Sequence, residues 1–153
     1  MAYHWQAKRF DELTTRELYD LLRLRTDVFV VEQSCPYPEL DGKDDHPETI
    51  HLWHAGEDGR VAACARLLAP GVSYGGVSMG RVAVHNTYRG IGLAHAMVDK
   101  AIELAGRAWP GKKIEIGAQE YLTAFYKYHG FRVVSAPYLE DNIPHIDMVL
   151  NQT

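Results

Sequence analysis

Met79-Gly-Arg-Val-Ala-Val84 and, after a short loop, Arg89-Gly-Ile-Gly-Leu-Ala94 stand at the centre of the sequence. The apolar first part predicts a buried strand, and the second part predicts a glycine-containing turn that opens a helix. Gly90 and Gly92 lack side chains where the helix begins, so the backbone N–H groups of its first turn face an incoming ligand. With the positive end of the helix dipole and the charge of Arg89, these groups predict a phosphate-binding turn.

Two familiar phosphate loops do not fit this turn. The dinucleotide-binding fingerprint needs a small third residue, and counting from Gly90 that residue would be His95. The nucleoside-triphosphate loop needs Gly-Lys followed by Ser or Thr, which the chain does not contain. What remains is Arg-x-x-Gly-x-Ala directly after a strand, from Arg89 to Ala94.

Hydrophobic periodicity predicts a mixed sheet with helices on both faces. The turn opens a helix that runs to Trp109, and a capping box at Thr14 to Glu17 opens an earlier helix that continues or breaks near Arg25. Further elements follow from apolar runs and glycine turns: a hairpin of 49–55 and 60–68, a strand over 113–118, a helix over 121–129, and closing strands over 131–134 and 146–150 joined through 138–145. The helix after the turn has an apolar face made of Ala94, Met97, Val98, Ala101, Ile102 and Ala105.

Length and composition predict a single domain over residues 1–153, since the chain has 153 residues and 46% hydrophobic content. A formal charge of −4 and no local run of Lys and Arg argue against a nucleic-acid partner. The N-terminal residues lack the apolar core of a signal peptide and no segment is long enough to span a membrane, which favours a cytoplasmic protein with no membrane partner. Cys35 and Cys64 are expected to be free thiols.

A second motif links these features to a known protein family. Gln119-x-x-Leu-x-x-Phe125-Tyr126-x-x-x-Gly-Phe131 is similar to a segment of the GCN5-related N-acetyltransferases (GNAT), and the Arg89 turn resembles the coenzyme A pyrophosphate turn of the same family. Within that family the chain resembles the ElaA-type subgroup through 25–33, 35–37, 41–42 and 141–145. The segment from Val28 to Asp44 is also similar to acyl-homoserine lactone synthases, a more distant relation.

The resemblance implies an α+β, three-layer α/β/α fold with a mixed, largely antiparallel central sheet. It implies an N-acetyltransferase that uses acetyl-CoA and a small-molecule or peptide amine acceptor, by direct attack in a ternary complex; a homodimer is compatible with it. The pantetheine arm would pair with the backbone of Val82, Ala83 and Val84, and the pyrophosphate would lie on the amides of Arg89, Gly90, Ile91, Gly92, Leu93 and Ala94. Gln119 would contact the coenzyme, and a backbone N–H of the central strand would face the oxyanion.

Tyr126 falls on the position of the family's general acid for the leaving thiolate. With pKa values of about 8.5 for a thiol and about 10 for a phenol, the proton transfer is uphill by about 2 kcal/mol, which local polarisation can offset. The alternative role for Tyr126 is that of a core tyrosine with a satisfied hydroxyl group.

The general base is not identified by the sequence, because the central strand, from Val77 to Asn86, contains no acid. The candidates are Glu32, Asp41, His51, Glu115 and His145, each of which also fits a solvated or structural role. Deprotonating a lysine-like amine at pH 7 costs about 4.6 kcal/mol and an α-amine about 1 kcal/mol, so a weak base suits an α-amine.

Two other interpretations follow from the same residues. His51 and His54 lie near Asp44 and Asp45, but side chains three apart on a strand point to opposite faces, so no metal site is expected. The missing acid also leaves open a non-catalytic acyl-CoA-binding or regulatory domain that keeps the phosphate turn.

Overall fold

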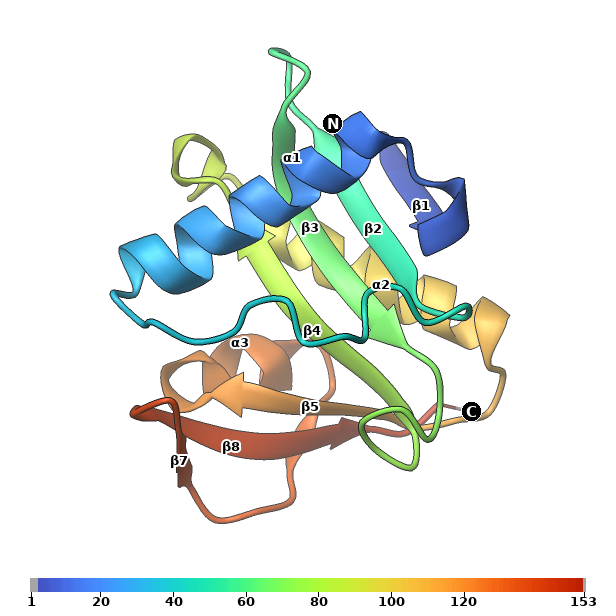
Figure 1. The fold of residues 1–153 in the computed structure, drawn as a ribbon. Coiled ribbons are helices and arrows are strands. Elements are labelled where there is room, and N and C mark those ends of the chain that lie inside the picture. Colours follow the sequence, from blue (N-terminus) through green and yellow to red (C-terminus); the bar gives the residue numbers. More distant parts are fainter. Residues whose placement is uncertain (1–2, 153) are drawn as a thin grey trace.

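A mixed sheet of eight strands runs through residues 3–152, the part of the chain that the computed structural model describes (Figure 1). The strand order is β1-β2-β3-β4-β5-β8-β6, and β7 pairs with β8. Within these residues every pairing is antiparallel except that of β4 with β5. The strands are β1 (Trp5–Arg9), β2 (Ile50–Ala55), β3 (Val61–Leu68), β4 (Val77–Val84), β5 (Ile114–Gln119), β6 (Arg132–Val133), β7 (Tyr138–Glu140) and β8 (Ile143–Leu150).

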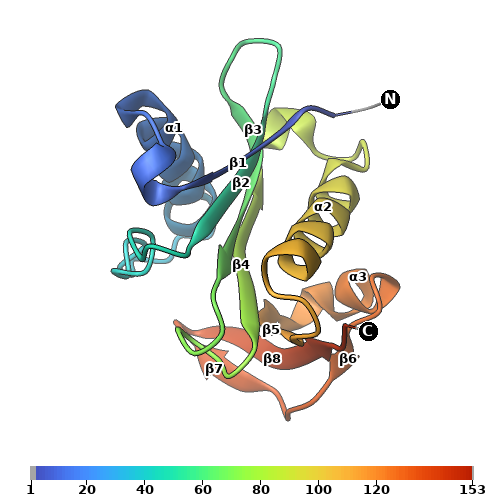
Figure 2. The ribbon, with the colours of Figure 1, turned by 90° about the vertical axis from the view of Figure 1, so that its right-hand side faces the viewer.

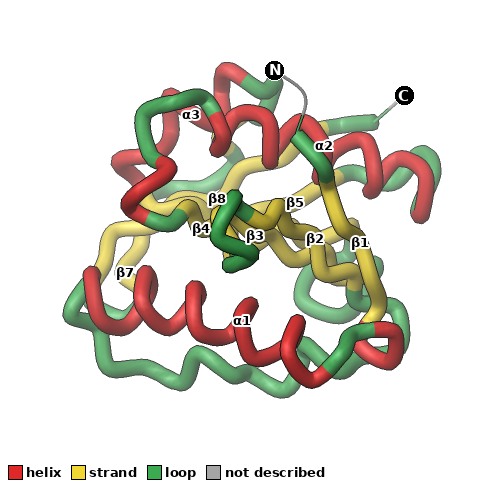
Figure 3. The backbone as a smooth tube through the Cα atoms, turned by 90° about the horizontal axis from the view of Figure 1, so that it is seen from above, coloured by secondary structure: helices red, strands yellow, loops and turns green. Residues whose placement is uncertain are grey.

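Helices cover both faces of the sheet, which confirms the three-layer prediction. Helix α1 (Thr15–Thr26) lies on one face, while α2 (Leu93–Ala108) and α3 (Thr123–Tyr128) lie on the other (Figures 2 and 3). Every residue of β3 is buried, because both of its faces are covered near the middle of the sheet. The continuous apolar run of that strand follows from this position.

The expected apolar face of α2 packs on the sheet. Met97, Val98, Ala101 and Ala105 are fully buried against the strands, whereas Ala94 and Ile102 of the same predicted face are only partly buried. On the opposite side of the sheet a smaller cluster forms under α1, with Leu21, Leu24, Val28, Trp53 and Cys64 among its members.

Helix α1 begins where its sequence predicts. The backbone N–H of Glu17 donates to Thr14 Oγ1 at 3.1 Å, and the N–H of Thr14 donates to Glu17 Oε1 at 2.9 Å. The helix does not break near Arg25 but continues as a wider π-helical segment, Asp27–Glu32. At the end of this continuation Glu32 pairs with Arg89, and the next residue, Gln33, bonds to Gln119 of β5.

The C-terminal part differs from its prediction in two places. The segment expected to join the closing strands forms β7 and a tight turn, in which Asp141 and Asn142 adopt positive φ angles of 50° and 63°. The expected strand over 131–134 is reduced to the two residues of β6. Strand β1 was not predicted, and it pairs with β2 at the edge of the sheet.

Strands β4 and β5 pair only at their first residues. Val77 pairs with Ile114 and Ser78 pairs with Glu115, after which the two strands separate. A bulge in β4 accompanies the separation, since Arg81 and Val82 together oppose Ala65 of β3, and Arg81 has a φ of 53°. A cleft therefore opens in the middle of the sheet.

Candidate functional site

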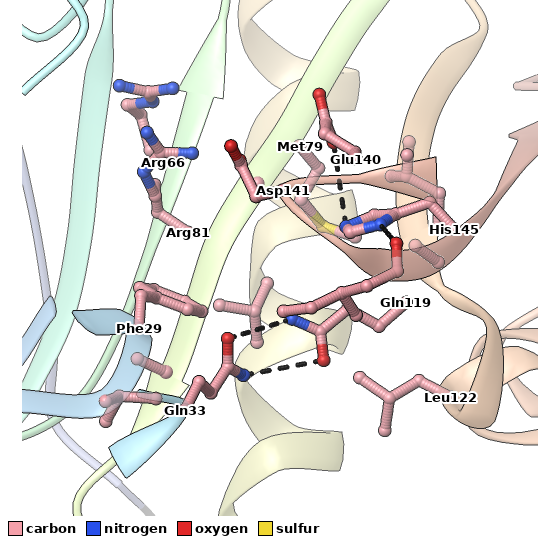
Figure 4. Close-up of a pocket in the computed structure, with 18 of the residues that line it drawn as sticks. Phe29, Gln33, Arg66, Met79, Arg81, Gln119, Leu122, Glu140, Asp141 and His145 are labelled. Atoms are coloured by element: carbon pink, nitrogen blue, oxygen red, sulfur yellow. Dashed lines mark hydrogen bonds and ion pairs between the residues drawn. The ribbon is translucent and has the colours of Figure 1, made fainter. Parts of the chain in front are cut away.

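A cavity of about 810 Å³ occupies the cleft between β4 and β5. Its size falls within the range of about 300–1,000 Å³ that is usual for small-molecule sites. The walls come from β4, β5, the π-helical segment, the loop that follows it and the turn between β7 and β8 (Figure 4). Segments far apart in the sequence thus meet around one space.

Five of the predicted coenzyme residues line this cavity, from β4, the turn after it and β5. Val82, Ala83, Val84, Arg89 and Gln119 line it. The remaining turn residues lie at the start of α2, where Gly90 and Gly92 have φ angles of 81° and 80°. Such left-handed angles strain any residue with a side chain, which explains the two glycines. Of the other turn residues, Ile91 is exposed, Leu93 is buried and Ala94 lies between.

Arg89 and Glu32 form an ion pair across the mouth of the cavity. Arg89 Nη2 lies 2.8 Å from Glu32 Oε2, and Arg89 Nε donates to the carbonyl oxygen of Val84 at 3.0 Å. The guanidinium is therefore aligned with the end of β4. Glu32, a candidate base, is therefore already paired with the guanidinium of Arg89.

Gln119 is joined to Gln33 by a reciprocal amide pair. Gln119 Nε2 donates to Gln33 Oε1 at 3.2 Å, and Gln33 Nε2 donates to Gln119 Oε1 at 3.4 Å (Figure 4). The pair links β5 with the residue that follows the π-helical segment. Both glutamines line the cavity.

Tyr126 lines the cavity from α3 and is only 7% exposed. Burial, with a smaller contribution from Tyr121, raises the pKa of its hydroxyl to about 12. The phenol therefore carries its proton throughout the physiological pH range. A group in this state can donate a proton and cannot serve as a base. Phe125 and Phe131 contact the Tyr126 ring edge-on, with centroids 5.0 and 5.8 Å away.

A buried cluster of charges fixes the loop after the π-helical segment. Arg25, which is 2% exposed, donates to Glu39 Oε2 at 2.6 Å and to Asp44 Oδ1 at 2.7 Å. Arg66 of β3 joins the cluster through Asp44 Oδ1 at 3.1 Å. We call the set the buried charge cluster after its buried members Arg25, Glu39, Asp44 and Arg66; it also includes Asp41, which is exposed, and Arg81, which is half-buried.

Asp41, another candidate base, belongs to this cluster. Arg66 donates to both of its carboxylate oxygens, at 2.9 and 2.8 Å. Although burial acts in the opposite direction, the Arg66 guanidinium holds the pKa of Asp41 well below its usual range. Asp41 lines the cavity, but its lone pairs and its charge are already engaged.

The other three candidates lie in different places. His51 is 2% exposed and outside the cavity lining, with Nε2 at 2.9 Å from the carbonyl oxygen of Asp44, and burial lowers its pKa. Glu115 is also outside the lining and accepts a bond from the N–H of Gly76 at 2.7 Å. His145 does line the cavity, with Nδ1 at 2.7 Å from the carbonyl oxygen of Ile143 and Nε2 at 3.6 Å from Glu140 Oε2 (Figure 4).

Comparison with known proteins decides the family. A family model described as an acetyltransferase (GNAT) domain matches residues 29–152. The Escherichia coli (strain K12) protein ElaA is 40% identical over 146 residues, which cover 94% of each chain. The chain belongs to the GNAT family. Its similarity to ElaA over nearly the whole length also confirms the ElaA-type subgroup.

Solved GNAT structures show the same fold. An acyl-CoA N-acyltransferase from Pseudomonas aeruginosa superposes with a TM-score of 0.91 at 44% identity, covering 97% of this chain and 99% of that one. Escherichia coli ElaA gives 0.90 at 38% identity over the same shares. The acyl-homoserine lactone synthase BjaI shares the fold at a TM-score of 0.79, with 17% identity and coverage of 99% and 84%. The chain is thus an acyltransferase by family and by fold.

Several polar residues of this GNAT site were not singled out from the sequence. Tyr37, Arg66, Tyr74 and Arg81 line the cavity, and Asp147 on β8 lies behind it. For Asp147 a signal was present, since it is an acid inside the apolar strand Ile146-Asp-Met-Val-Leu150. The side chains of Arg66 and Arg81 could not be placed, because their partners come from a loop without periodicity.

Other features of the GNAT chain can be stated for the described residues. In residues 3–152 there is no cluster of three or more His, Cys, Asp or Glu side chains arranged to hold a metal ion. No helix in that range has the length and apolar character needed to cross a membrane. Cys35 and Cys64 are both buried free thiols, as expected.

The buried charge cluster generates a prediction about stability. Asp44→Asn removes the carboxylate that Arg25 and Arg66 share and leaves each arginine with one carboxylate partner fewer, so the free energy of unfolding at pH 7 should fall by about 3 kcal/mol. Arg25 keeps the pKa of Asp44 below its usual value despite burial. The contribution of this carboxylate is therefore complete above the unfolded pKa of about 3.9 and is lost as the pH falls below it.

Urea unfolding at several pH values measures both effects. The difference between wild type and Asp44→Asn should narrow below about pH 4. Asp45→Asn is the matched control, because Asp45 is next to Asp44 in the sequence and its side chain is exposed. Equal stability of the two variants at pH 7 would contradict the role of the cluster.

Proposed function

We propose that the protein is an acetyl-CoA-dependent N-acetyltransferase that transfers the acetyl group to an amine by direct attack in a ternary complex. The observation that carries the proposal is the separation of β4 and β5 after two residue pairs. It leaves backbone groups of β4 facing the cavity, and these can pair with the amides of an extended pantetheine arm. Val82, Ala83 and Val84 supply these groups.

The two ends of the coenzyme arm have suitable surroundings. The pyrophosphate would lie on the amides from Arg89 to Ala94, at the positive end of the α2 dipole. The thioester would lie beside the bulge at Arg81 and Val82, where a backbone N–H can face the developing oxyanion. Gln119 would contact the coenzyme once its hydrogen bonds to Gln33 are broken.

Tyr126 would protonate the departing thiolate. Its position in the cavity wall and its protonated state support this role. The acceptor would be a small-molecule or peptide amine. An α-amine suits the site because its pKa is low enough for a weak base to deprotonate it. The reaction requires no metal, and we place the enzyme in the cytoplasm.

A non-catalytic acyl-CoA-binding domain is the second candidate. It is favoured by the engagement of Glu32 with Arg89 and of Asp41 with Arg66. Both candidates predict saturable binding of acetyl-CoA. They differ in thiol release when amines are supplied.

An acceptor screen separates the two candidates. Thiol release should rise above the background hydrolysis of acetyl-CoA with at least one class of amine, and mass spectrometry should find that amine acetylated. The panel should contain α-amino compounds, N-terminal peptides, polyamines and lysine side chains. Saturable acetyl-CoA binding without acetylated product from any amine would reject the enzyme.

Tyr126→Phe tests the general acid. Loss of the phenolic proton should lower kcat by about 100-fold, as is usual for a lost acid, while acetyl-CoA affinity measured by calorimetry stays within about twofold. Tyr128→Phe is the control, since Tyr128 lies on the same helix with 77% exposure. A kcat equal to that of the control would rule out this role.

Gly92→Ala tests the phosphate turn. A Cβ at this positive φ should shift the amides that would hold the pyrophosphate, and the Kd for acetyl-CoA should rise by about tenfold or more. Gly59→Ala imposes the same strain, because Gly59 also has a φ of 80°, but in the hairpin between β2 and β3. The control should lose similar stability and keep its affinity. Equal affinities in both variants would argue against the turn as the phosphate site.

A further inference from the structure

A polar row lies on one face of β5 and β8, beyond the point where β4 separates. Gln119 of β5 stands opposite His145 of β8, and Gly117 stands opposite Asp147. Because alternate residues of a strand share a face, these side chains point to the same side of the sheet. The neighbouring core residues Ile116 and Ala118 are buried on the other side.

Gly117 provides the space in which three polar groups meet. A Cβ at this position would lie 3.0 Å from Tyr138 Oη, 3.1 Å from Tyr74 Oη and 3.7 Å from Asp147 Oδ1. Any other residue would displace at least one hydroxyl group. The glycine therefore brings two phenols and a carboxylate together beside the cavity, whose lining includes Tyr74 and Gly117.

The carboxylate is held in a fixed orientation. Tyr138 donates its hydroxyl proton to Asp147 Oδ1 at 2.6 Å. The backbone N–H of Asp147 donates to Ser135 Oγ at 2.9 Å, which fixes the main chain beneath it. Tyr138 in turn stacks on His145, with centroids 6.0 Å apart.

Tyr74 is positioned by its loop from both sides. The N–H of Gly71 donates to the carbonyl oxygen of Tyr74 at 2.7 Å. On the other side, the N–H of Gly76 donates to Glu115 Oε2 at 2.7 Å. Glu115, a candidate base from the sequence, thus anchors the loop that presents Tyr74.

The surroundings keep the Tyr74 phenol protonated. Burial, followed by the charges of Asp147, Glu140 and Glu115, raises its pKa to about 12. A protonated phenol can accept a hydrogen bond on its oxygen while donating its own proton to a carboxylate. The charged or titratable groups around Asp147 come from the loop (Tyr74), β7 (Tyr138, Glu140), β5 (Glu115) and β8 (His145).

We propose that Tyr74 and Asp147 receive the proton of the acceptor amine. The bound ammonium first gives one proton to Tyr74 Oη, while the Tyr74 proton passes to Asp147. The neutral nitrogen then attacks the thioester carbon, so that the C–N bond forms and the C–S bond breaks. The sulfur takes a proton from Tyr126, the amide nitrogen releases its surplus proton to solvent, and solvent restores Tyr126 and Asp147. This inference rests on the proposed acetyltransfer.

The location agrees with this step. Gly117 comes two residues after Glu115, the last residue of β5 that pairs with β4. Gly117, beside which Tyr74 and Asp147 meet, therefore stands near the start of the cleft, and Arg81 of the bulge lines the same cavity. The nearby acids also favour approach of a cationic amine.

Asp147→Asn and Tyr74→Phe test the proposal at saturating acetyl-CoA. At about pH 7 we expect kcat/KM for the amine to fall about 100-fold in Asp147→Asn and about 30-fold in Tyr74→Phe. The KM for acetyl-CoA should stay within about twofold. Asp45→Asn and Tyr19→Phe are matched controls, since Tyr19 is 65% exposed on α1 and Asp45 is exposed.

The pH profile distinguishes proton transfer from a structural role. Without the pair, turnover should depend on amine that is already neutral, so log(kcat/KM) should rise with a slope near 1 between about pH 6 and 8. Wild type should give a shallower slope. A uniform loss at unchanged slope, or activities within about twofold of wild type, would overturn the proposal.

Three further experimental outcomes can each be interpreted. If Asp147→Asn does not fold, Tyr74→Phe decides alone, because it keeps the Asp147 carboxylate and its partner Tyr138. If wild type acetylates no amine at all, the proposed function fails, and the pair fails with it. If wild type acetylates an amine and the variants are unaffected, the proposed function stands and only the role of Tyr74 and Asp147 is rejected.

Discussion

The separation of β4 from β5 is the constraint on which the site depends. A sheet normally continues its ladder, because unpaired backbone groups inside a protein are costly. Here the ladder stops after Ser78 and Glu115, while β5 continues to pair with β8 on its other side as far as Gln119. The bulge at Arg81 bends β4 away from β5. The backbone edge left facing the cavity suits a ligand that carries amides of its own.

The buried charge cluster shapes the wall of the cavity that comes from the loop after the π-helical segment. The loop from Gln33 to Pro47 has no regular structure, so its backbone cannot be ordered by a ladder or a helix. Arg25 from α1 and Arg66 from β3 hold it through Glu39, Asp41 and Asp44 instead. Burying such charges is favourable only when every partner is present. The cluster therefore enforces one loop conformation rather than adding much net stability.

The sequence predicted the parts of this molecule that follow local rules. Capping at Thr14, the period of α2 and the glycines of the turn each reflect short-range physics, and they place α1, α2 and the turn that precedes α2. The turn at Asp141 and Asn142 lacked the glycine that usually marks a hairpin, so β7 was missed.

The remaining site residues depend on long-range register, which no local pattern contains. Gln33 meets Gln119 across 86 positions, and Asp147 meets Gly117 only through the pairing of β8 with β5. The resemblance to acetyltransferases assigned coenzyme roles to residues 82–84, 89–94 and 119 because motifs lie there. It assigned no role to Tyr74 or Asp147, which come from a loop and from an apolar strand.

Burial at Tyr126 changes the balance of the proposed proton transfer. From a phenol with a pKa of about 12 to a thiolate with its ordinary pKa of about 8.5, the transfer would be uphill by about 5 kcal/mol. The thiolate, however, would leave within the same cavity and lose water as well. Burial acts in the same direction on the thiol of Cys64, whose pKa it raises to about 12. A dry site thus raises both pKa values together and brings acid and leaving group close to a match, whereas water entering beside the sulfur alone would restore the mismatch.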